Sequence, residues 1–116
     1  METEEEYTPG EGIFCEAFGD TPRNRIMESF LFSSCEHTIE DTAEDTGLPN
    51  IVTYEIMQTL LKEEFIIPTR KVSEGQLYTL NKKSKRVQVL LQIGNLLTDR
   101  LTKEYAAKYP QEALQH

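Results

Sequence analysis

The sequence predicts a mainly α-helical fold that carries one small β-hairpin. Apolar residues recur in several segments at the three- and four-residue spacing of a helix face. Two runs of β-forming residues, 65–72 and 77–80, are joined by a turn that contains glycine. The chain has 116 residues, of which 38% are hydrophobic, and a chain of this size buries one modest core. We therefore expect a single domain with short tails.

The N-terminal part divides into an acidic tail, an apolar patch and a helix. Residues 1–12 are acidic and show no apolar periodicity, so we expect them to be a disordered tail. Residues 13–18, IFCEAF, are apolar enough to pack on the domain or on a partner. A helix over about 22–34 follows, which Asp20 or Thr21 can cap and which has proline in its first turn. Its apolar face comprises Ile26, Met27, Phe30 and Leu31.

Two further helices are separated by a tight turn. A minimal extended segment at 37–38 precedes a helix over 39–46, and Gly47 ends this helix because glycine takes the left-handed conformation without steric cost. The next helix is expected over about 49–64. Its inward positions are Val52 or Thr53, Ile56, Met57, Leu60 and Leu61, and its outward positions are Asn50, Ile51, Tyr54, Glu55, Gln58 and Lys62.

An antiparallel hairpin is expected next, with strands over 65–72 and 77–80 and a turn over 73–76. Pro68 has no amide hydrogen to donate, so it must occupy an edge or a bulge. A two-stranded sheet is marginally stable alone and has to lean on the helices.

A long helix over 82–109, stopped by Pro110, ends the domain, and residues 110–116 form a second tail. Its apolar residues follow the spacing of a coiled-coil seam, and their area exceeds what a small domain covers. A second copy of the chain is the expected cover, although the same face could fold back on its own domain. The residues of this predicted homodimer interface are Val87, Leu90, Leu91, Gly94, Leu97 and Leu101.

Charge is distributed unevenly along the chain. The formal net charge is −8, but the first 20 residues hold seven acids and no base, so the rest carries only −1. Half of the 12 basic residues lie within Arg70–Arg86, where Glu74 is the only acid. Because attraction to phosphates depends on the local field over a surface, this cluster points to nucleic acid despite the overall sign.

Several classes of protein are disfavoured. No apolar run approaches the ~20 residues that cross a bilayer, and METEEEY lacks the features of a signal peptide, so we expect a cytoplasmic protein with no membrane partner. His37 and His116 are too few for a catalytic triad or a metal site, and no phosphate-binding loop occurs, so neither an enzyme nor a cofactor is expected. Cys35 is expected to be a small packing residue; a redox-sensing thiol is the weaker alternative for Cys15 or Cys35.

The order helix, helix, turn, helix, hairpin, long helix is that of a winged helix-turn-helix. The segments FGDTPRNRIMESFL, HTIEDTAEDTGLPNIVTYEIMQTLLKEEFI and RKVSEGQLYTLNKKSKRVQVLLQI resemble the compact archaeal winged-helix transcription regulators of the broad MarR/ArsR-like class. These regulators typically carry GDTPRNRIL in the first helix, TISDIAEATGIS in the second and YxLNxxxxxVxxL at the exit of the wing. The resemblance covers residues 18 to about 97.

The resemblance implies a homodimeric regulator of transcription, a repressor by expectation, that binds double-stranded DNA. The winged domain would span 13–81, with the reading helix at 49–64 and the wing at 65–80, and 82–109 would form the dimerisation helix. Asn50 and Glu55 stand where members of the class often carry basic residues. The implied base-reading residues are Asn50, Ile51, Thr53, Tyr54, Glu55 and Gln58, and Pro49 begins the reading helix.

Phosphate contacts are expected from the wing and from basic residues outside the reading helix. Those residues are Arg23, Arg25, Arg70, Lys71, Gly75, Gln76, Lys82, Lys83, Lys85 and Arg86, with Ser73 and Glu74 in the wing turn. The alternative is a protein-interaction module on the same fold, in which the acidic tail contacts a basic protein. The absence of base between Pro49 and Leu61 favours that alternative, and the basic cluster favours DNA.

Overall fold

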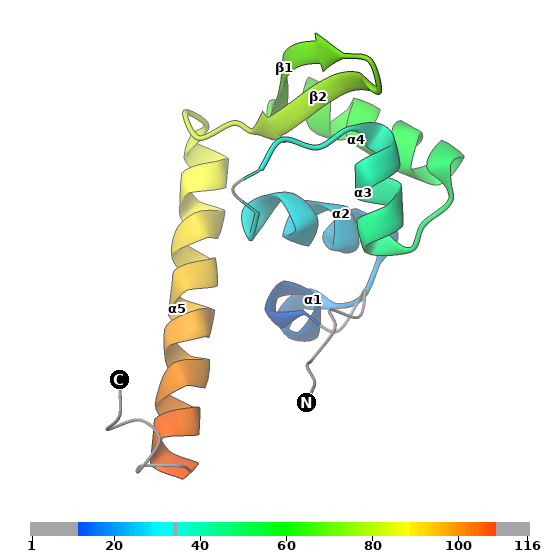
Figure 1. Ribbon diagram of the computed structural model, residues 1–116. Coiled ribbons are helices and arrows are strands. Elements are labelled where there is room, and N and C mark those ends of the chain that lie inside the picture. Colours follow the sequence, from blue (N-terminus) through cyan, green and yellow to red (C-terminus); the bar gives the residue numbers. More distant parts are fainter. Residues whose placement is uncertain (1–11, 34, 109–116) are drawn as a thin grey trace.

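The computed structural model describes residues 12–33 and 35–108, with the side chains of residues 101, 102 and 105 left out. The chain is mostly helical and has a two-stranded antiparallel hairpin, an arrangement compatible with a winged helix (Figure 1). The tails expected over 1–12 and 110–116 lie outside the described residues, apart from Gly12. The elements are α1 (Ile13–Phe18), α2 (Pro22–Leu31), α3 (Ile39–Thr46), α4 (Asn50–Lys62), β1 (Ile66–Val72), β2 (Gly75–Leu80) and α5 (Lys85–Lys108).

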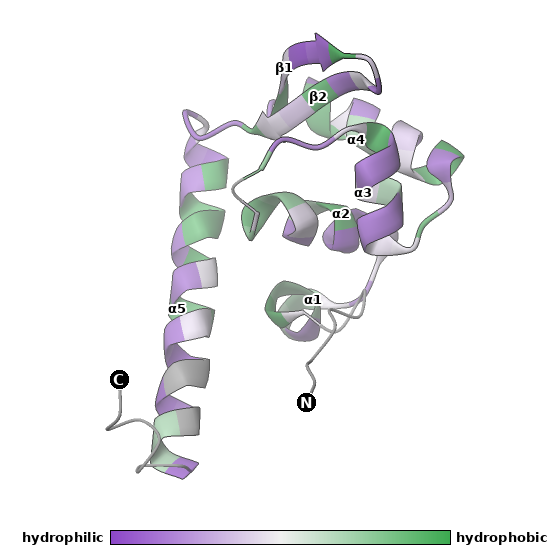
Figure 2. Cartoon of the chain, in the orientation of Figure 1, coloured by the Kyte–Doolittle hydropathy of each residue, from purple (hydrophilic) through white to green (hydrophobic). Residues whose placement is uncertain are grey.

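Helix α2 lies at the centre of the domain and contacts α1, α3, α4, α5 and β2. In Figure 1, α1 lies below α2, the hairpin lies above it and α5 runs along the left edge. Figure 2 shows hydrophobic residues on α1, α2 and the upper part of α5, while the visible side of α3 is largely hydrophilic. The buried core consists of Phe14, Ile26, Met27, Phe30, Leu31, Met57, Leu60, Phe65, Ile66, Tyr78, Leu80 and Val87.

The ends of the short helices are set by local hydrogen bonds. The Thr21 side chain accepts from the Asn24 amide at 3.1 Å and caps α2, as expected for one of its two candidate caps. Thr38 and Asp41 form a reciprocal capping box at the start of α3. Gly47 has φ of 74° and ends α3 in the left-handed conformation, which confirms the predicted boundary. Helix α2 ends at Leu31, three residues before the predicted end.

The hairpin is antiparallel and has an irregularity between Pro68 and Lys71, as the missing amide of proline requires. The turn is shorter than expected: it comprises residues 73–74, and Gly75 and Gln76 already belong to β2. Gly75 has φ of 132°, so glycine lets the chain enter β2 at once. His37 pairs with Tyr78 in an isolated bridge, which confirms the minimal extended segment and ties the chain before α3 to the hairpin.

Helix α5 begins at Lys85, so the expected start at residue 82 is wrong. Residues 82–83 form a turn in which the Lys83 amide donates to Asn81 Oδ1 at 3.2 Å. The Ser84 hydroxyl then accepts from the Val87 amide at 3.4 Å, which is the position of a helix cap. Within the described residues no helix, α5 included, is both long and apolar enough to cross a membrane.

The predicted dimer seam on α5 largely faces its own domain. Val87 is 0% exposed within the core, and Leu90 and Leu91 pack against that core. Gly94 is buried, and a Cβ there would lie 3.1 Å from the ring of Phe32. The expectation that Val87 and Gly94 meet a second copy is therefore wrong, and folding back on the same chain is the outcome. Leu97 lies beside Ile13 and Ala17, and the side chain of Leu101 lies outside the described residues.

Candidate nucleic-acid interface

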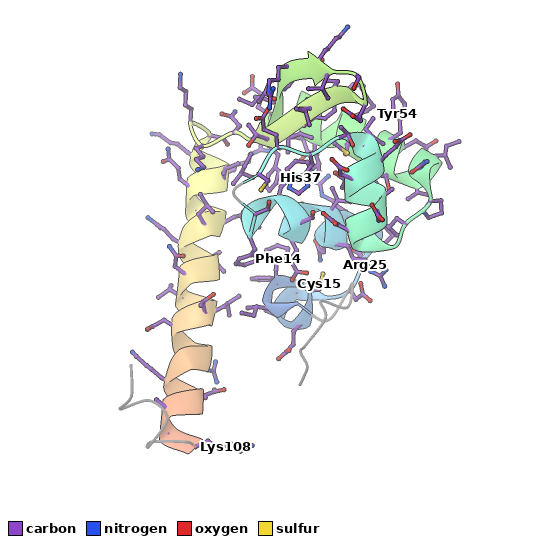
Figure 3. All side chains as sticks on the ribbon, viewed as in Figure 1. Phe14, Cys15, Arg25, His37, Tyr54 and Lys108 are labelled. Carbon is purple, nitrogen blue, oxygen red and sulfur yellow. The ribbon has the colours of Figure 1, made fainter. Side chains whose placement is uncertain are left out.

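A groove lies between the start of α3, the start of α4 and the turn of the hairpin, and we call it the α4 groove. Its volume is about 490 Å³. Figure 3 places Tyr54 beside the hairpin, above α3. The groove therefore has the two parts expected of a winged-helix reading surface, a helix start and a projecting hairpin. Its lining residues are Thr38, Ile39, Glu40, Asn50, Ile51, Tyr54, Glu74, Gly75 and Gln76.

Helical spacing divides α4 into a core face and a groove face. Met57 and Leu60 are buried, while Ile51 is 68% exposed and Tyr54 is 51% exposed. Asn50 and Glu55 are exposed, and Gln58 is half-buried. Thr53 corrects the sequence-based expectation, since it is 0% exposed and its hydroxyl donates to the Pro49 carbonyl at 2.9 Å. Thr53 therefore holds the start of α4 in place and is not on the surface.

The start of α4 points its backbone polarity at the groove. Pro49 occupies the cap position, and among the described residues it makes no side-chain hydrogen bond to the first amides of the helix. The first amides of a helix carry partial positive charge and suit an anionic group. The groove thus contains a weak positive pole although its lining has no cation.

The wing contributes one paired and one unpaired cation. Arg70 Nε lies 3.4 Å from Glu36 Oε1. Hydrogen bonding from Thr69, with the charge of Arg70 as a smaller cause, lowers the pKa of Glu36. Lys71 is exposed, lies opposite Gln76 in the strand register and has no ion pair with another described residue. Because opposite residues of an antiparallel pair share a face, Lys71 lies on the side of the groove-lining Gln76.

The basic cluster, defined as Lys82, Lys83, Lys85 and Arg86, is exposed but lies away from the α4 groove. The Asn81 side chain donates to the Glu64 carbonyl at 2.9 Å, which anchors this segment just past the end of α4. Helix α4 has 13 residues and is about 20 Å long, so the cluster and Asn50 lie at opposite ends of it. Figures 1 and 3 likewise show the β2–α5 connection and Tyr54 on opposite sides of the hairpin.

The two arginines of α2 separate in space. Arg23 pairs with Glu63 and lines the same small cavity as Arg86, so it joins the basic cluster as expected. Arg25 binds both carboxylate oxygens of Asp20 at 2.6 and 2.9 Å and donates to the Thr46 carbonyl at 3.1 Å. These hydrogen bonds from Arg25 lower the pKa of Asp20. Arg25 therefore links α2 to the end of α3, and its expected phosphate contact does not fit this arrangement.

Comparison of the chain with protein-family models, with curated proteins and with solved structures found no match.

A cluster of polar side chains that sequence reasoning missed lies between α2 and α3. His37 is buried, its Nε2 lies 2.9 Å from Ser33 Oγ, and its Nδ1 lies 3.6 Å from Asp45 Oδ2. The Ser33 hydroxyl also accepts a hydrogen bond from the Cys35 amide at 3.1 Å, which stabilises the loop after α2. Figure 3 shows His37 between α2 and the hairpin. Their spacing in the sequence does not predict this cluster, because Ser33 and His37 lie in the loop before α3 and Asp45 lies near its end.

Glu28 is a second residue that the sequence did not single out. It is buried, and its Oε2 accepts from the amides of Phe14 and Cys15 at 2.9 and 3.1 Å, which caps α1 from another helix. Gly12 permits this approach, since a Cβ there would lie 2.3 Å from the Glu28 carboxylate oxygens. Glu28 falls on the inward side of α2. A buried acid needs hydrogen-bond partners, so an acid on an inward helix face is the sequence feature that could have identified Glu28.

The two cysteines have opposite surroundings. Cys15 is buried, and burial, followed by the nearby charge of Glu28, raises its pKa to about 11. Cys35 is exposed, so the expectation that it is a packing residue is wrong. Among the described residues no group of three or more His, Cys, Asp or Glu side chains could hold a metal ion.

Proposed function

We propose that this chain binds double-stranded DNA sequence-specifically and regulates transcription by binding, not by catalysis. The observation that supports the proposal best is the exposed start of α4 beside a projecting hairpin. Ile51 and Tyr54 are open to solvent there, and the helix start has no side-chain cap among the described residues. The resemblance of the sequence to archaeal winged-helix regulators of the MarR/ArsR-like class points the same way.

The chemistry of the accessible side chains of α4 suits base edges better than phosphates. Asn50 can pair with adenine through two hydrogen bonds, and Ile51 can contact the methyl group of thymine. Glu55 can accept from the amino group of cytosine. Lys71 and the amides at the start of α4 would contact the backbone nearby. Gln58 is half-buried and contributes less.

The basic cluster would contact phosphates about 20 Å from Asn50, on a flanking part of the same duplex. Such contacts add affinity and orientation without sequence preference. Arg23 lines the same small cavity as Arg86 and would extend this second surface. Base edges and the nearby backbone would therefore be contacted at the start of α4, and flanking phosphates beyond its other end.

A salt titration of random-sequence duplex tests the proposal. Fluorescence anisotropy from about 50 to about 200 mM salt should show affinity falling with salt, and Lys83→Glu with Arg86→Glu should reduce the log–log slope by about 2. Asn50→Ala should instead change the sequences selected from a random duplex pool. Lys103→Glu, an exposed charge change far along α5, is the matched control and should leave the slope within error. Absence of salt-dependent binding by the parent chain contradicts the proposal.

A protein-interaction module is the second candidate, and the charge of the α4 groove favours it. Glu40 and Glu74 line the groove, and none of the described lining residues is lysine or arginine. A basic segment of another protein would fit this surface better than a phosphate backbone does. If the parent chain does not bind duplex DNA at about 50 mM salt, the result would support a protein-interaction module.

A homodimer would use the outward side of α5 and not the predicted seam. Leu96 is 69% exposed, Val89 is also exposed, and their seven-residue spacing places them on one stripe. Residues 85–98 contain Lys85 and Arg86 and no acid, so an antiparallel pair keeps the four cations of two copies apart.

Sedimentation equilibrium across a concentration series tests this dimer. Leu96→Glu should shift the parent chain toward the monomer, because it places a charge in the stripe. Asn95→Glu adds the same charge beside the stripe and should change the association much less. A parent chain that stays monomeric, or two variants that behave alike, argues against an interface at Leu96.

A further inference from the structure

A cavity of about 400 Å³ lies between the start of α1, the end of α2 and the end of α3, away from the α4 groove. We call it the α2–α3 cavity. Its size falls within the range of small-molecule sites, which are mostly apolar and carry a few convergent polar groups. Ile13 and Phe32 supply apolar surface, and Glu28, His37 and Asp45 supply polar groups.

The charge of this lining selects one class of ligand. Glu28 and Asp45 are acids, and among the described residues that line the cavity there is no lysine or arginine. A negatively charged ligand would be repelled by the two carboxylates of the lining. A ligand with an amine head and an apolar body would match both halves of the lining.

The polar groups are held in place before any ligand arrives. The ring of His37 packs edge-on against Phe30, with centroids 4.9 Å apart, and hydrogen-bonds to Ser33. Glu28 is held by two backbone amides of α1. Asp45 is more open to solvent than these two groups, with its side chain 52% exposed and its Oδ2 3.6 Å from His37 Nδ1. Fixed polar groups reduce the entropy that binding costs.

From this arrangement we infer that the α2–α3 cavity binds small organic amines, with the ammonium group beside Asp45 and the apolar body against Phe32 and Ile13. The α2–α3 cavity and the α4 groove share no lining residue. A ligand there would contact His37, whose backbone exchanges two hydrogen bonds with Tyr78 of β2 at 2.9 and 2.8 Å. Binding would therefore also be sensed at the hairpin.

Titration of the isotope-labelled full chain, followed by amide chemical shifts, tests the inference. Phenethylamine should cause saturable shifts at Ser29, Ser33 and Tyr78, with a dissociation constant on the order of 1 mM. Phenethyl alcohol, which lacks the charge, should bind about fivefold more weakly, and phenylacetate should not saturate. Equal binding of the anion, or no saturable shift with the amine, overturns the inference.

Two variants locate the site. Asp45→Asn should remove the preference for the amine over the alcohol, whereas Glu44→Gln, the same charge change one residue away and outside the cavity lining, should keep it. Ser29→Leu should fill the cavity and abolish binding of both probes. An amine preference that survives Asp45→Asn, or falls equally in Glu44→Gln, refutes a specific site, and neither outcome depends on whether the chain binds DNA.

Discussion

Replacing Ile26 with alanine should lower the free energy of unfolding by about 3 kcal/mol. Ile26 is 0% exposed and belongs to the core between α2 and its neighbours, so its removal leaves a cavity that the packed helices can fill only in part. Urea unfolding followed by circular dichroism measures the change, and the slope with denaturant should stay constant.

The same substitution at Ile51 is the matched control. Ile51 is one of the most exposed hydrophobic side chains of the described residues, so Ile51→Ala should change the stability by less than about 0.5 kcal/mol. Its effect should appear instead in the binding of duplex DNA, as a loss of preference at one base position. A loss of stability at Ile51 as large as that at Ile26 would mean that the start of α4 is packed and not available for contact.

The second large effect is expected at Glu28, where Glu28→Ala should lower the free energy of unfolding by about 3 kcal/mol. The substitution leaves the buried amides of Phe14 and Cys15 without their acceptor, and unsatisfied buried donors are expensive. Glu28→Gln keeps one oxygen acceptor and should cost less than Glu28→Ala. Urea unfolding, together with amide hydrogen exchange of α1, measures the loss and where it occurs.

Glu16 provides the comparison within α1. It is exposed and lies in the first turn of that helix, so Glu16→Ala removes an acid without uncovering a buried donor. Its cost should stay near the few tenths of a kcal/mol that a surface charge at a helix start contributes. If Glu16→Ala and Glu28→Ala cost the same, helix-start charge and not the buried carboxylate holds α1 in place.

The described residues form two separate polar surfaces linked by the hairpin. The α4 groove meets one end of β2 through Gly75 and Gln76, and the α2–α3 cavity reaches Tyr78 through the backbone of His37. Only Leu77 lies between Gln76 and Tyr78 in that strand.

Local elements were predictable because their causes act over a few residues. The helix over 39–46 was predicted with the bounds that the structure has, since its apolar spacing and the glycine after it are both local. The irregularity at Pro68 follows from one missing amide. The predicted end of α2 and the predicted start of α5 were each wrong by three residues. In α5 the Ser84 hydroxyl caps the helix, so the helix begins after the turn and not at residue 82.

The candidate site was predictable only in part. Asn50, Ile51 and Tyr54 do share one exposed face of α4 with the wing beside it, as helical spacing indicated. Thr53 was expected both as a possible inward position and as a base-reading residue. Its burial, with a hydrogen bond to the Pro49 carbonyl, confirms the inward position and rules out the contact with bases. The basic cluster was correctly found as a sequence feature, but its distance from Asn50 depends on the length of α4 and on how Asn81 attaches to Glu64.

By itself the sequence determined most of the helices, the hairpin and which side of α4 is exposed, because caps, glycine and proline effects and apolar periodicity act within a few residues. It did not predict that residues 13–18, expected only as an apolar patch, form helix α1. Only the tertiary structure decided which side of α5 is covered, that Glu28 caps a helix from another element, and that Ser33, His37 and Asp45 meet at one cavity. These outcomes depend on how whole elements pack against one another. Helix α5 has apolar residues on two sides, so apolar spacing alone could not show which side is covered.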